Sequence, residues 1–394
     1  MTPIRLAIRR LSRRIACVFC LSFVAACAPE MQAPKVPVFF PPAPELPRIQ
    51  YLTSFSGLHD IEHQSAFDRF VVGEKPDLQV DKPYGLAIHD GKIYVCDTNS
   101  TVFVFDLKDE TFAQLAGAVG PGRLRQPTNI SVTADGTKYV ADPVRGQVVV
   151  FGPDDQYVGA FGVPGTWRPV DVARYEERLY VVDAQKRAVL ALDPKTGALL
   201  KTIGDKGGPT EILDRPTNLA FDTEGYLYVT DFSRFQVLKY DRDGHFKARF
   251  GDLGADYGHF ARPKGLAVDK EGRLYAVDAS FNNVQIFNRD GRLLLFFGGS
   301  GEENGNLTLP AKVALDYDNL SYFEKYLEPG FQPEYLILVT SQFGDRRVNV
   351  FAYGRQQGKS YPSDADALEA LEERKKKNAS QQAPASAPAP AEAP

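Results

Sequence analysis

Six prolines recur along the chain at an almost constant spacing, and this recurrence constrains the fold more than any other feature. Successive members are separated by 44, 42, 47, 47 and 47 residues. They are Pro83, Pro127, Pro169, Pro216, Pro263 and Pro310. Proline suits the first residue of a strand, where no backbone donor is needed. A period of about 40 to 50 residues is typical of repeat arrays, so we expect six similar units.

Each unit reads as four short strands separated by turns. The clearest copy spans residues 262–298, where Gly272 and Gly291 supply the positive φ that hairpin turns require. In five units an aspartate ends the second strand: Asp97, Asp142, Asp183, Asp231 and Asp278. A single four-stranded sheet would leave both faces wet. The pattern therefore predicts an all-β fold, a six-bladed β-propeller of four-stranded antiparallel blades packed around one axis.

The ends of the chain indicate how the ring closes. Residues 48–55 resemble the outermost strands expected at 244–251 and 291–298, but no blade follows them directly. The sixth unit stops at residues 348–351 and lacks an outer strand. We therefore expect residues 48–55 to complete the sixth blade, because closure protects strand edges that an open ring would expose.

Three recurring motifs resemble a known family. They are Pro-x-Gly-Leu-Ala-Val-Asp at 263–269, Leu-Tyr-Val-x-Asp at 227–231 and Val-x-Ile-Phe at 284–287. Together they resemble the NHL repeat, whose family fold is the six-bladed β-propeller. The resemblance covers roughly residues 48–354, and its sixfold recurrence makes it specific.

The first 26 residues lie outside the predicted fold. Five arginines precede an apolar run at 15–26 that is too short to span a bilayer as a mature helix. The run ends in Val-Ala-Ala-Cys, which resembles the bacterial lipoprotein cleavage box and implies that Cys27 becomes the lipid-bearing first residue. By the same resemblance, Ala28 favours the outer over the inner membrane. The alternative is an ordinary secretory signal cut near Ala26.

Two low-complexity segments flank the predicted propeller. Residues 27–47 are rich in proline and predict an extended tether without hydrogen-bonded structure. Residues 355–394 predict a short helix, capped by residues 363–366, and a disordered Ala/Pro-rich tail.

The charge balance bears on the class of partner. Without the five arginines of the signal, 41 basic residues stand against 50 acidic ones, a net charge of −9. Some NHL proteins bind RNA through a basic face. An acidic, exported protein is not expected to bind nucleic acid.

One position in each unit is expected to face the central channel. It lies two residues after each opening proline and reads Gly85, Asn129, Asp171, Asn218, Gly265 and Lys312. Resemblance to six-bladed lactonases implies a calcium ion held there by Asn, Asp and Glu. Here only one carboxylate is present and Lys312 opposes a cation. The residues therefore favour a polar, water-filled channel, at most a weak ion or ligand site, and no metal is predicted.

No catalytic set is visible in the sequence. No nucleophile elbow occurs, and no histidine falls on an axial position. The five recurring aspartates are expected to accept backbone N–H groups in their own turns instead.

The sixth unit departs from the others by about 17 extra residues between Asp316 and Glu334. Residues 321–327 predict a short helix ended by Pro-Gly. Four aromatic residues of the insertion are candidates for a partner surface: Tyr322, Phe323, Tyr326 and Phe331. They either form an exposed patch or fold back to plug the base of the ring. The aspartate position of this unit is expected to be Gln342.

These patterns favour a binding protein over an enzyme. We expect a lipid-anchored propeller of the cell envelope that acts as a scaffold for another envelope or extracellular protein. Comparable exported propellers suggest a secretion or multihaem electron-transfer assembly. The alternative is a lactonase- or lyase-like enzyme with a metal site in the central channel.

Overall fold

The computed structural model describes residues 36–62, 77–99 and 101–363, together with Asp366 and Glu369. Val38 begins the compact unit that contains every strand. Cys27, the apolar run before it and most of the carboxyl-terminal tail lie outside the described residues.

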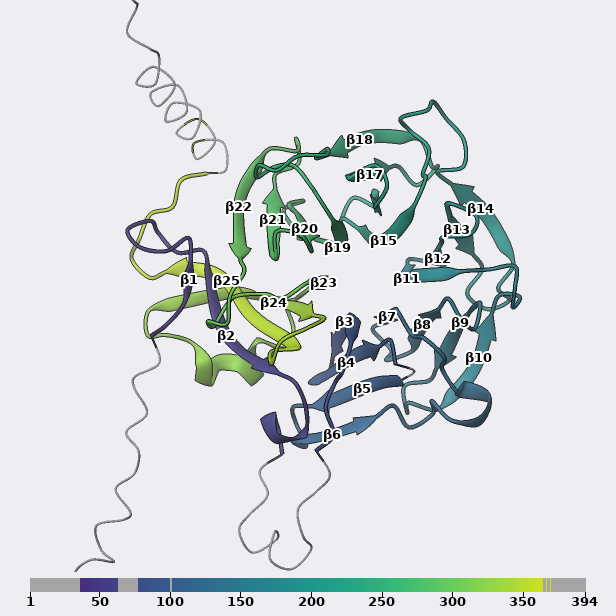
Figure 1. Cartoon of the computed structure of the whole chain (residues 1–394), viewed down its shortest axis with the longest axis horizontal. Helices are drawn as coiled ribbons and strands as arrows, with labels where there is room; N and C mark the ends of the chain where they lie inside the picture. The colour runs from purple at the N-terminus through teal and green to yellow at the C-terminus, as the bar shows by residue number, and fades with distance from the viewer. Residues whose placement is uncertain (1–35, 63–76, 100, 364–365, 367–368, 370–394) are drawn as a thin grey trace, which may run out of the picture. The chain divides into compact units, whose positions relative to one another are not determined.

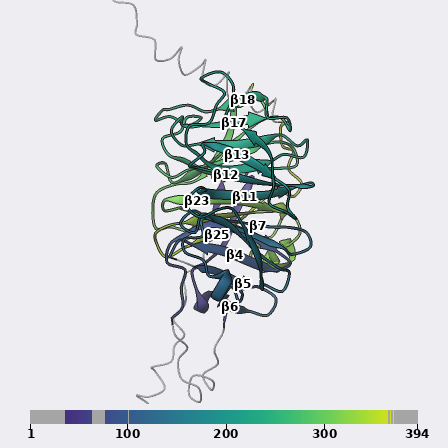
Figure 2. The same cartoon turned by 90° about the vertical axis from the view of Figure 1, so that its right-hand side faces the viewer.

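The strands form six antiparallel sheets, one for each predicted unit (Figures 1 and 2). Blade 1 contains β3 (Pro83–His89), β4 (Lys92–Asp97), β5 (Thr101–Asp106) and β6 (Thr111–Gln114). Blade 2 contains β7 (Asn129–Val132), β8 (Lys138–Asp142), β9 (Gln147–Phe151) and β10 (Tyr157–Phe161). Blade 3 contains β11 (Pro169–Tyr175), β12 (Arg178–Asp183), β13 (Ala188–Leu192) and β14 (Leu199–Ile203).

The remaining blades follow the same order. Blade 4 contains β15 (Pro216–Phe221), β16 (Leu227–Asp231), β17 (Gln236–Tyr240) and β18 (Phe246–Phe250). Blade 5 contains β19 (Pro263–Val268), β20 (Leu274–Asp278), β21 (Asn283–Phe287) and β22 (Leu293–Gly298). Blade 6 contains β23 (Pro310–Asp316), β24 (Phe331–Ser341), β25 (Val348–Gln356) and β2 (Ile49–Phe55).

The ring closes as predicted. Each inner strand contacts the inner strands of its two neighbours, and β23 contacts β3. Strand β2, from the amino-terminal side, pairs antiparallel with β25, with Ile49 opposite Tyr353 and Phe55 opposite Val348. The sheet of blade 6 is thereby completed by residues nearly 300 positions away in the sequence, and the prediction of closure by residues 48–55 is confirmed.

The tether prediction needs a correction at its end. Strand β1 (Phe39–Phe40) pairs with β2 and adds a fifth strand to blade 6. Tyr51 N–H donates to the Val38 carbonyl over 2.9 Å. Two phenylalanines can bury apolar surface on the closing blade, so this part of the proline-rich segment is hydrogen bonded.

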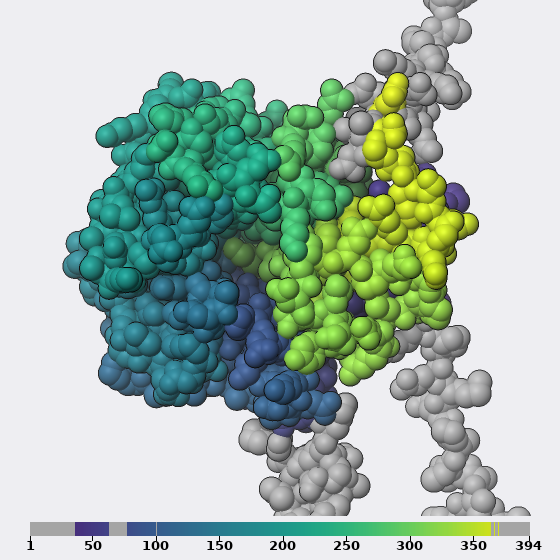
Figure 3. Space-filling model, turned by 180° about the vertical axis from the view of Figure 1, so that it is seen from behind, coloured from purple at the N-terminus to yellow at the C-terminus, as the bar shows by residue number. Residues whose placement is uncertain are grey.

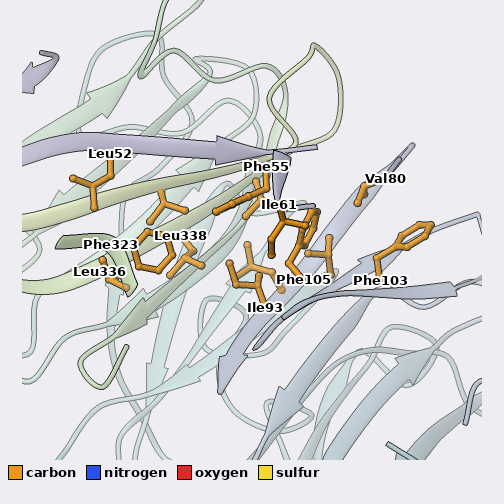
Figure 4. Close-up of a cluster of buried hydrophobic side chains, with 14 of the residues drawn as sticks. Leu52, Phe55, Ile61, Val80, Ile93, Phe103, Phe105, Phe323, Leu336 and Leu338 are labelled. Carbon is orange, nitrogen blue, oxygen red and sulfur yellow. The ribbon is translucent and has the colours of Figure 1, made fainter. Parts of the chain in front are cut away.

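The seam between blades 6 and 1 holds the largest apolar cluster (Figure 4). Leu52 and Phe55 of the closing strand meet Phe105 of blade 1, and the Phe55 and Phe105 ring centroids lie 5.6 Å apart. The 3₁₀ helix η1 (Leu58–Asp60) contributes Leu58 to the same cluster. Burial of these side chains fastens the two chain ends to the first blade.

The insertion in blade 6 forms the predicted short helix, η3 (Leu320–Tyr326). Asn319, which precedes it, accepts a hydrogen bond from Gly91 N–H of the β3–β4 turn over 2.8 Å. The Tyr322 ring lies directly against Gly91, where a side chain would find no room. The insertion therefore packs across the seam onto blade 1.

Candidate functional site

The predicted axial residues meet inside the ring. Lys312 of blade 6 places its ammonium 2.9 Å from a carboxylate oxygen of Asp171 in blade 3. These blades are opposite each other, so the two side chains must point at the axis and cross the channel. The same Asp171 oxygen accepts from Asn218 Nδ2 over 3.2 Å and from Leu219 N–H over 3.0 Å.

The two axial asparagines are also buried. Asn129 donates through Nδ2 to the Val170 carbonyl over 2.8 Å. The Oδ1 atoms of Asn129 and Asn218 have no hydrogen-bond partner within the described protein. Gly85 and Gly265 complete the ring, and a Cβ at either would collide with the backbone of the next blade. Water is the expected donor to the asparagine oxygens, as in the polar channel that the sequence favours.

This donor set does not fit a calcium ion. Calcium takes six to eight oxygen ligands, usually with several carboxylates. Asp171 supplies the one axial carboxylate, and the Lys312 ammonium already occupies the place beside it. Within the described ranges no group of three His, Cys, Asp or Glu side chains could hold a metal.

A second set of residues surrounds the start of the inner strands. In four blades the residue before the opening proline is basic: Lys82, Arg168, Arg215 and Arg262. Each of these residues is exposed. The backbone N–H of each donates to the aspartate that ends the second strand of its own blade, which we call the closing aspartate. For Arg262 and Asp278 this distance is 3.0 Å. The shared hydrogen bond holds the backbone of the four basic residues at equivalent places around the channel, and we call this set of residues the basic mouth.

The closing aspartates do more than predicted. Asp278 Oδ1 accepts from Ser280 and Phe281 N–H in its own turn, as expected. Its Oδ2 accepts from Ala261 and Arg262 N–H in the loop before the blade. In blade 6 the register places Ser341, not Gln342, opposite the opening proline. The Ser341 hydroxyl accepts from Thr308 N–H, so the assignment of Gln342 to this position was wrong by one residue.

Below the basic mouth lies a buried amine that sequence reasoning missed. Lys264 is only 6% exposed, and its Nζ donates to Gln342 Oε1 over 2.6 Å. It also lies 5.3 Å from the centre of the Tyr84 ring. Burial, with the neighbouring Arg262 and Lys82, lowers the pKa of Lys264 to about 7. Burial and Asp171 raise the pKa of Tyr84 to about 12, so its hydroxyl stays protonated.

A separate surface pocket lies on blade 2, on the side of the ring where the inner strands begin. It has a volume of about 620 Å³, and its lining includes Arg123, Arg125 and Arg145. Arg145 is fixed by Gln147 Oε1 at 2.7 Å and by the Arg123 carbonyl at 2.8 Å. Three exposed valines adjoin lining residues in the sequence: Val119 (68% exposed), Val144 (55%) and Val163 (59%). We call these valines and arginines the blade-2 patch.

The four aromatic residues of the insertion that were predicted as a partner surface are mostly covered by the protein itself. Phe323 is 1% exposed and Phe331 is 7% exposed, and both belong to the core cluster at the seam. Tyr322 and Tyr326 are half-buried and pack against the same cluster. The aromatic side chains fold back, but onto the seam between blades rather than into the axial channel. The spacing of apolar residues in this short insertion did not show whether its aromatic side chains would face solvent or pack against the blades.

Two further predictions concern the amino-terminal end of the chain and the membrane. Lipid attachment at Cys27 falls outside the described residues. Within the part of the chain that the structure describes, no helix is both long and apolar enough to cross a membrane.

Comparison with known proteins supports the fold and nothing finer. No family model matches the chain, and no curated protein matches it either. Several solved structures are similar. A gluconolactonase from Xanthomonas campestris has a TM-score of 0.51 and 16% identity, covering 80% of this chain and 100% of its own.

Two proteins of Bacteroides thetaiotaomicron are also similar. One, of unknown function, has a TM-score of 0.55 and 16% identity over 77% of this chain and 75% of its own. The other, described as an auxiliary nutrient binding protein, has a TM-score of 0.52 and 14% identity over 70% of each chain. At such identities the likeness concerns architecture alone. The chain is a six-bladed β-propeller similar to proteins that differ in function.

Proposed function

We propose that this protein is a binding propeller of the cell envelope, held to the membrane by lipid on Cys27, which recognises another envelope protein through the blade-2 patch. The observation that carries the proposal is the pocket on blade 2, which three arginines line and next to whose lining residues three exposed valines stand in the sequence. Arginine is enriched at the energetic centres of protein-binding surfaces, and the buried core of such a surface is more apolar than its rim.

The rigid scaffold supports a binding role. The loops of the patch are clamped to their blade, because Arg125 and Gln126 N–H donate to Asp142. A surface held still in the free protein loses little conformational entropy on association.

The axial channel supports the enzyme alternative less well. A lactonase-like metal site needs carboxylates that are free to bind a cation. Asp171 instead accepts hydrogen bonds from Lys312, Asn218 and a backbone amide. The partner would be an envelope protein, as in the secretion or multihaem electron-transfer assemblies that the family resemblance suggests.

Photo-cross-linking and affinity purification from the native envelope test the proposal. We expect Val144→Asp and Val163→Asp each to reduce recovery of the partner at least about tenfold, since a buried carboxylate at an interface costs more than 1.4 kcal/mol. Val158→Asp is the matched control, because Val158 is 67% exposed on the outer strand of the same blade. Equal recovery with all three variants would refute the role of the patch.

The membrane anchor has its own test. Cys27→Ala should move the protein from the membrane fraction to the soluble periplasmic or extracellular fraction and abolish incorporation of labelled fatty acid. A protein that stays in the membrane fraction without label would point to another mode of attachment.

A further inference from the structure

The four basic side chains of the mouth form no ion pair within the part of the chain that the structure describes, although the aspartates that end the second strands lie close to their backbone. Elsewhere on the surface arginines pair with acids, as Arg187 does with Asp214 at 3.1 Å and Arg242 with Glu176 at 2.9 Å. Among the described residues, no acidic side chain forms an ion pair with Lys82, Arg168, Arg215 or Arg262. Like charges around one opening repel one another, and a bound anion would relieve that repulsion.

A second observation is that Lys264 is buried and forms no ion pair with a carboxylate of the described residues. Its ammonium donates a hydrogen bond to the neutral amide oxygen of Gln342. Two cations, Arg262 and Lys82, are close enough to lower its pKa. Buried ammonium groups in proteins are usually paired with a negative charge. In the described part of the chain Lys264 forms no ion pair, and its two contacts are the Gln342 amide and the Tyr84 ring.

The Lys312–Asp171 ion pair lies across the channel below the basic mouth. Lys312 and Asp171 cross the axis two residues beyond the opening prolines, whereas the basic residues lie one residue before them. Successive strand residues are about 3.3 Å apart, so the backbone positions of Lys312 and Asp171 lie roughly 10 Å further along their strands than those of the basic residues. Seen from behind the view of Figure 1, the ring is hollowed at its centre, where the six blades meet (Figure 3).

We propose that the basic mouth is a binding site for a small oxyanion, a phosphate or carboxylate, held between Lys82 and Arg262 with Lys264 and the Tyr84 hydroxyl beneath it. Arg guanidinium and Lys ammonium donate charge-assisted hydrogen bonds to such groups, and Tyr84 can donate because it remains protonated. The contributing residues come from blades 1 and 5, with Gln342 of blade 6 orienting Lys264. This site lies on different blades from the blade-2 patch, so anion binding and partner binding succeed or fail independently.

Calorimetric titration of the full mature protein tests the site, with inorganic phosphate and succinate as probes in chloride buffer of low ionic strength. We expect saturable binding of at least one probe, and its preference tells phosphate from carboxylate recognition. Lys82→Gln and Arg262→Gln should each weaken this binding about tenfold. Both residues are exposed, so the variants should keep the wild-type melting temperature.

The control is Lys108→Gln, which removes the same charge from the exposed β5–β6 turn at the opposite edge of blade 1. It should bind the probes as the wild type does. Absence of saturable binding, or an equal loss in Lys108→Gln, would overturn the proposal. Binding of polyglutamate but of neither small probe would also overturn it and assign the mouth to an acidic chain.

Discussion

At the scale of single residues, two buried lysines behave in opposite ways. The ammonium of Lys312 meets Asp171 across the channel, so its charge is compensated inside the protein. The amine of Lys264 meets only a neutral amide and an aromatic ring. Burying a charge without a counter-charge disfavours the protonated form, which is why the pKa of Lys264 falls to about 7. The difference between them comes from neighbours on other blades.

Lys264→Met is expected to stabilise the protein in a pH-dependent way. The folded-state pKa of Lys264 is about 7, against 10.5 for the ordinary side chain, so the unfolded chain binds the extra proton more readily. The penalty is complete below about pH 7 and disappears as the pH rises toward about 10.5. At one pKa unit per 1.36 kcal/mol, we expect a gain on the order of 2 to 4 kcal/mol near pH 6. Urea unfolding of both proteins across this range measures it, and a gain that grows with pH would contradict the argument.

Lys312→Met should have the opposite effect. It would leave the Asp171 carboxylate buried without its cation, at a cost of about 3 kcal/mol in the free energy of unfolding. Asp171→Asn combined with Lys312→Met should recover most of this loss, because no buried charge remains. A double-mutant cycle of urea unfolding measures the coupling, and additive effects would show that the pair does not interact.

At the scale of one element, the closing aspartate ties a blade to the loop that enters it. Asp231 accepts from Asp214 and Arg215 N–H before its blade and from Ser233 and Arg234 N–H in its own turn. One carboxylate thus satisfies four backbone donors that would otherwise be buried or strained. The same bonds fix the backbone of the residue before the opening proline, which is basic in four blades. In these blades the closing aspartate therefore stabilises the loop and also positions the backbone of a residue of the basic mouth.

Asp278→Ala should destabilise the protein by about 3 to 5 kcal/mol, because several backbone N–H groups lose their acceptor. The control is Asp290→Ala in the exposed turn of the same blade, for which we expect a change of about 0.5 kcal/mol. Chemical unfolding gives both values. The Asp278 variant should also bind phosphate more weakly, because the backbone of Arg262 loses its hydrogen-bond acceptor. An unchanged free energy of unfolding would show that the loop keeps its conformation without Asp278.

At the scale of the whole molecule, the ring depends on a strand borrowed from the other end of the chain. Strand β2 carries Ile49 and Phe55, both almost fully buried, and pairs with β25 along its length. Burying each such side chain contributes about 1.5 to 3 kcal/mol. Four apolar residues of β2 therefore contribute an amount comparable with the stability of a typical domain.

A chain that begins after Phe55 should therefore lose cooperative folding or form oligomers through the free edge of β25. Size-exclusion chromatography and urea unfolding would detect either outcome. A synthetic peptide of residues 48–55 added in trans should restore a monomer with a wild-type urea midpoint. A truncated chain that unfolds at the wild-type midpoint without peptide would show that β2 is dispensable.

The amino-acid sequence alone determined the repeating architecture of this protein, because proline, aspartate and hairpin glycine act locally and recur with every blade. It also indicated the closing strand and the axial positions, since both follow from counting along identical units. Only the tertiary structure decided which side chains meet. The bridge from Lys312 to Asp171 joins opposite blades, the isolation of Lys264 depends on three blades, and the burial of Phe323 depends on contact with blade 1. Such contacts join residues far apart in the chain, and no local pattern records the surroundings that set their charge and exposure.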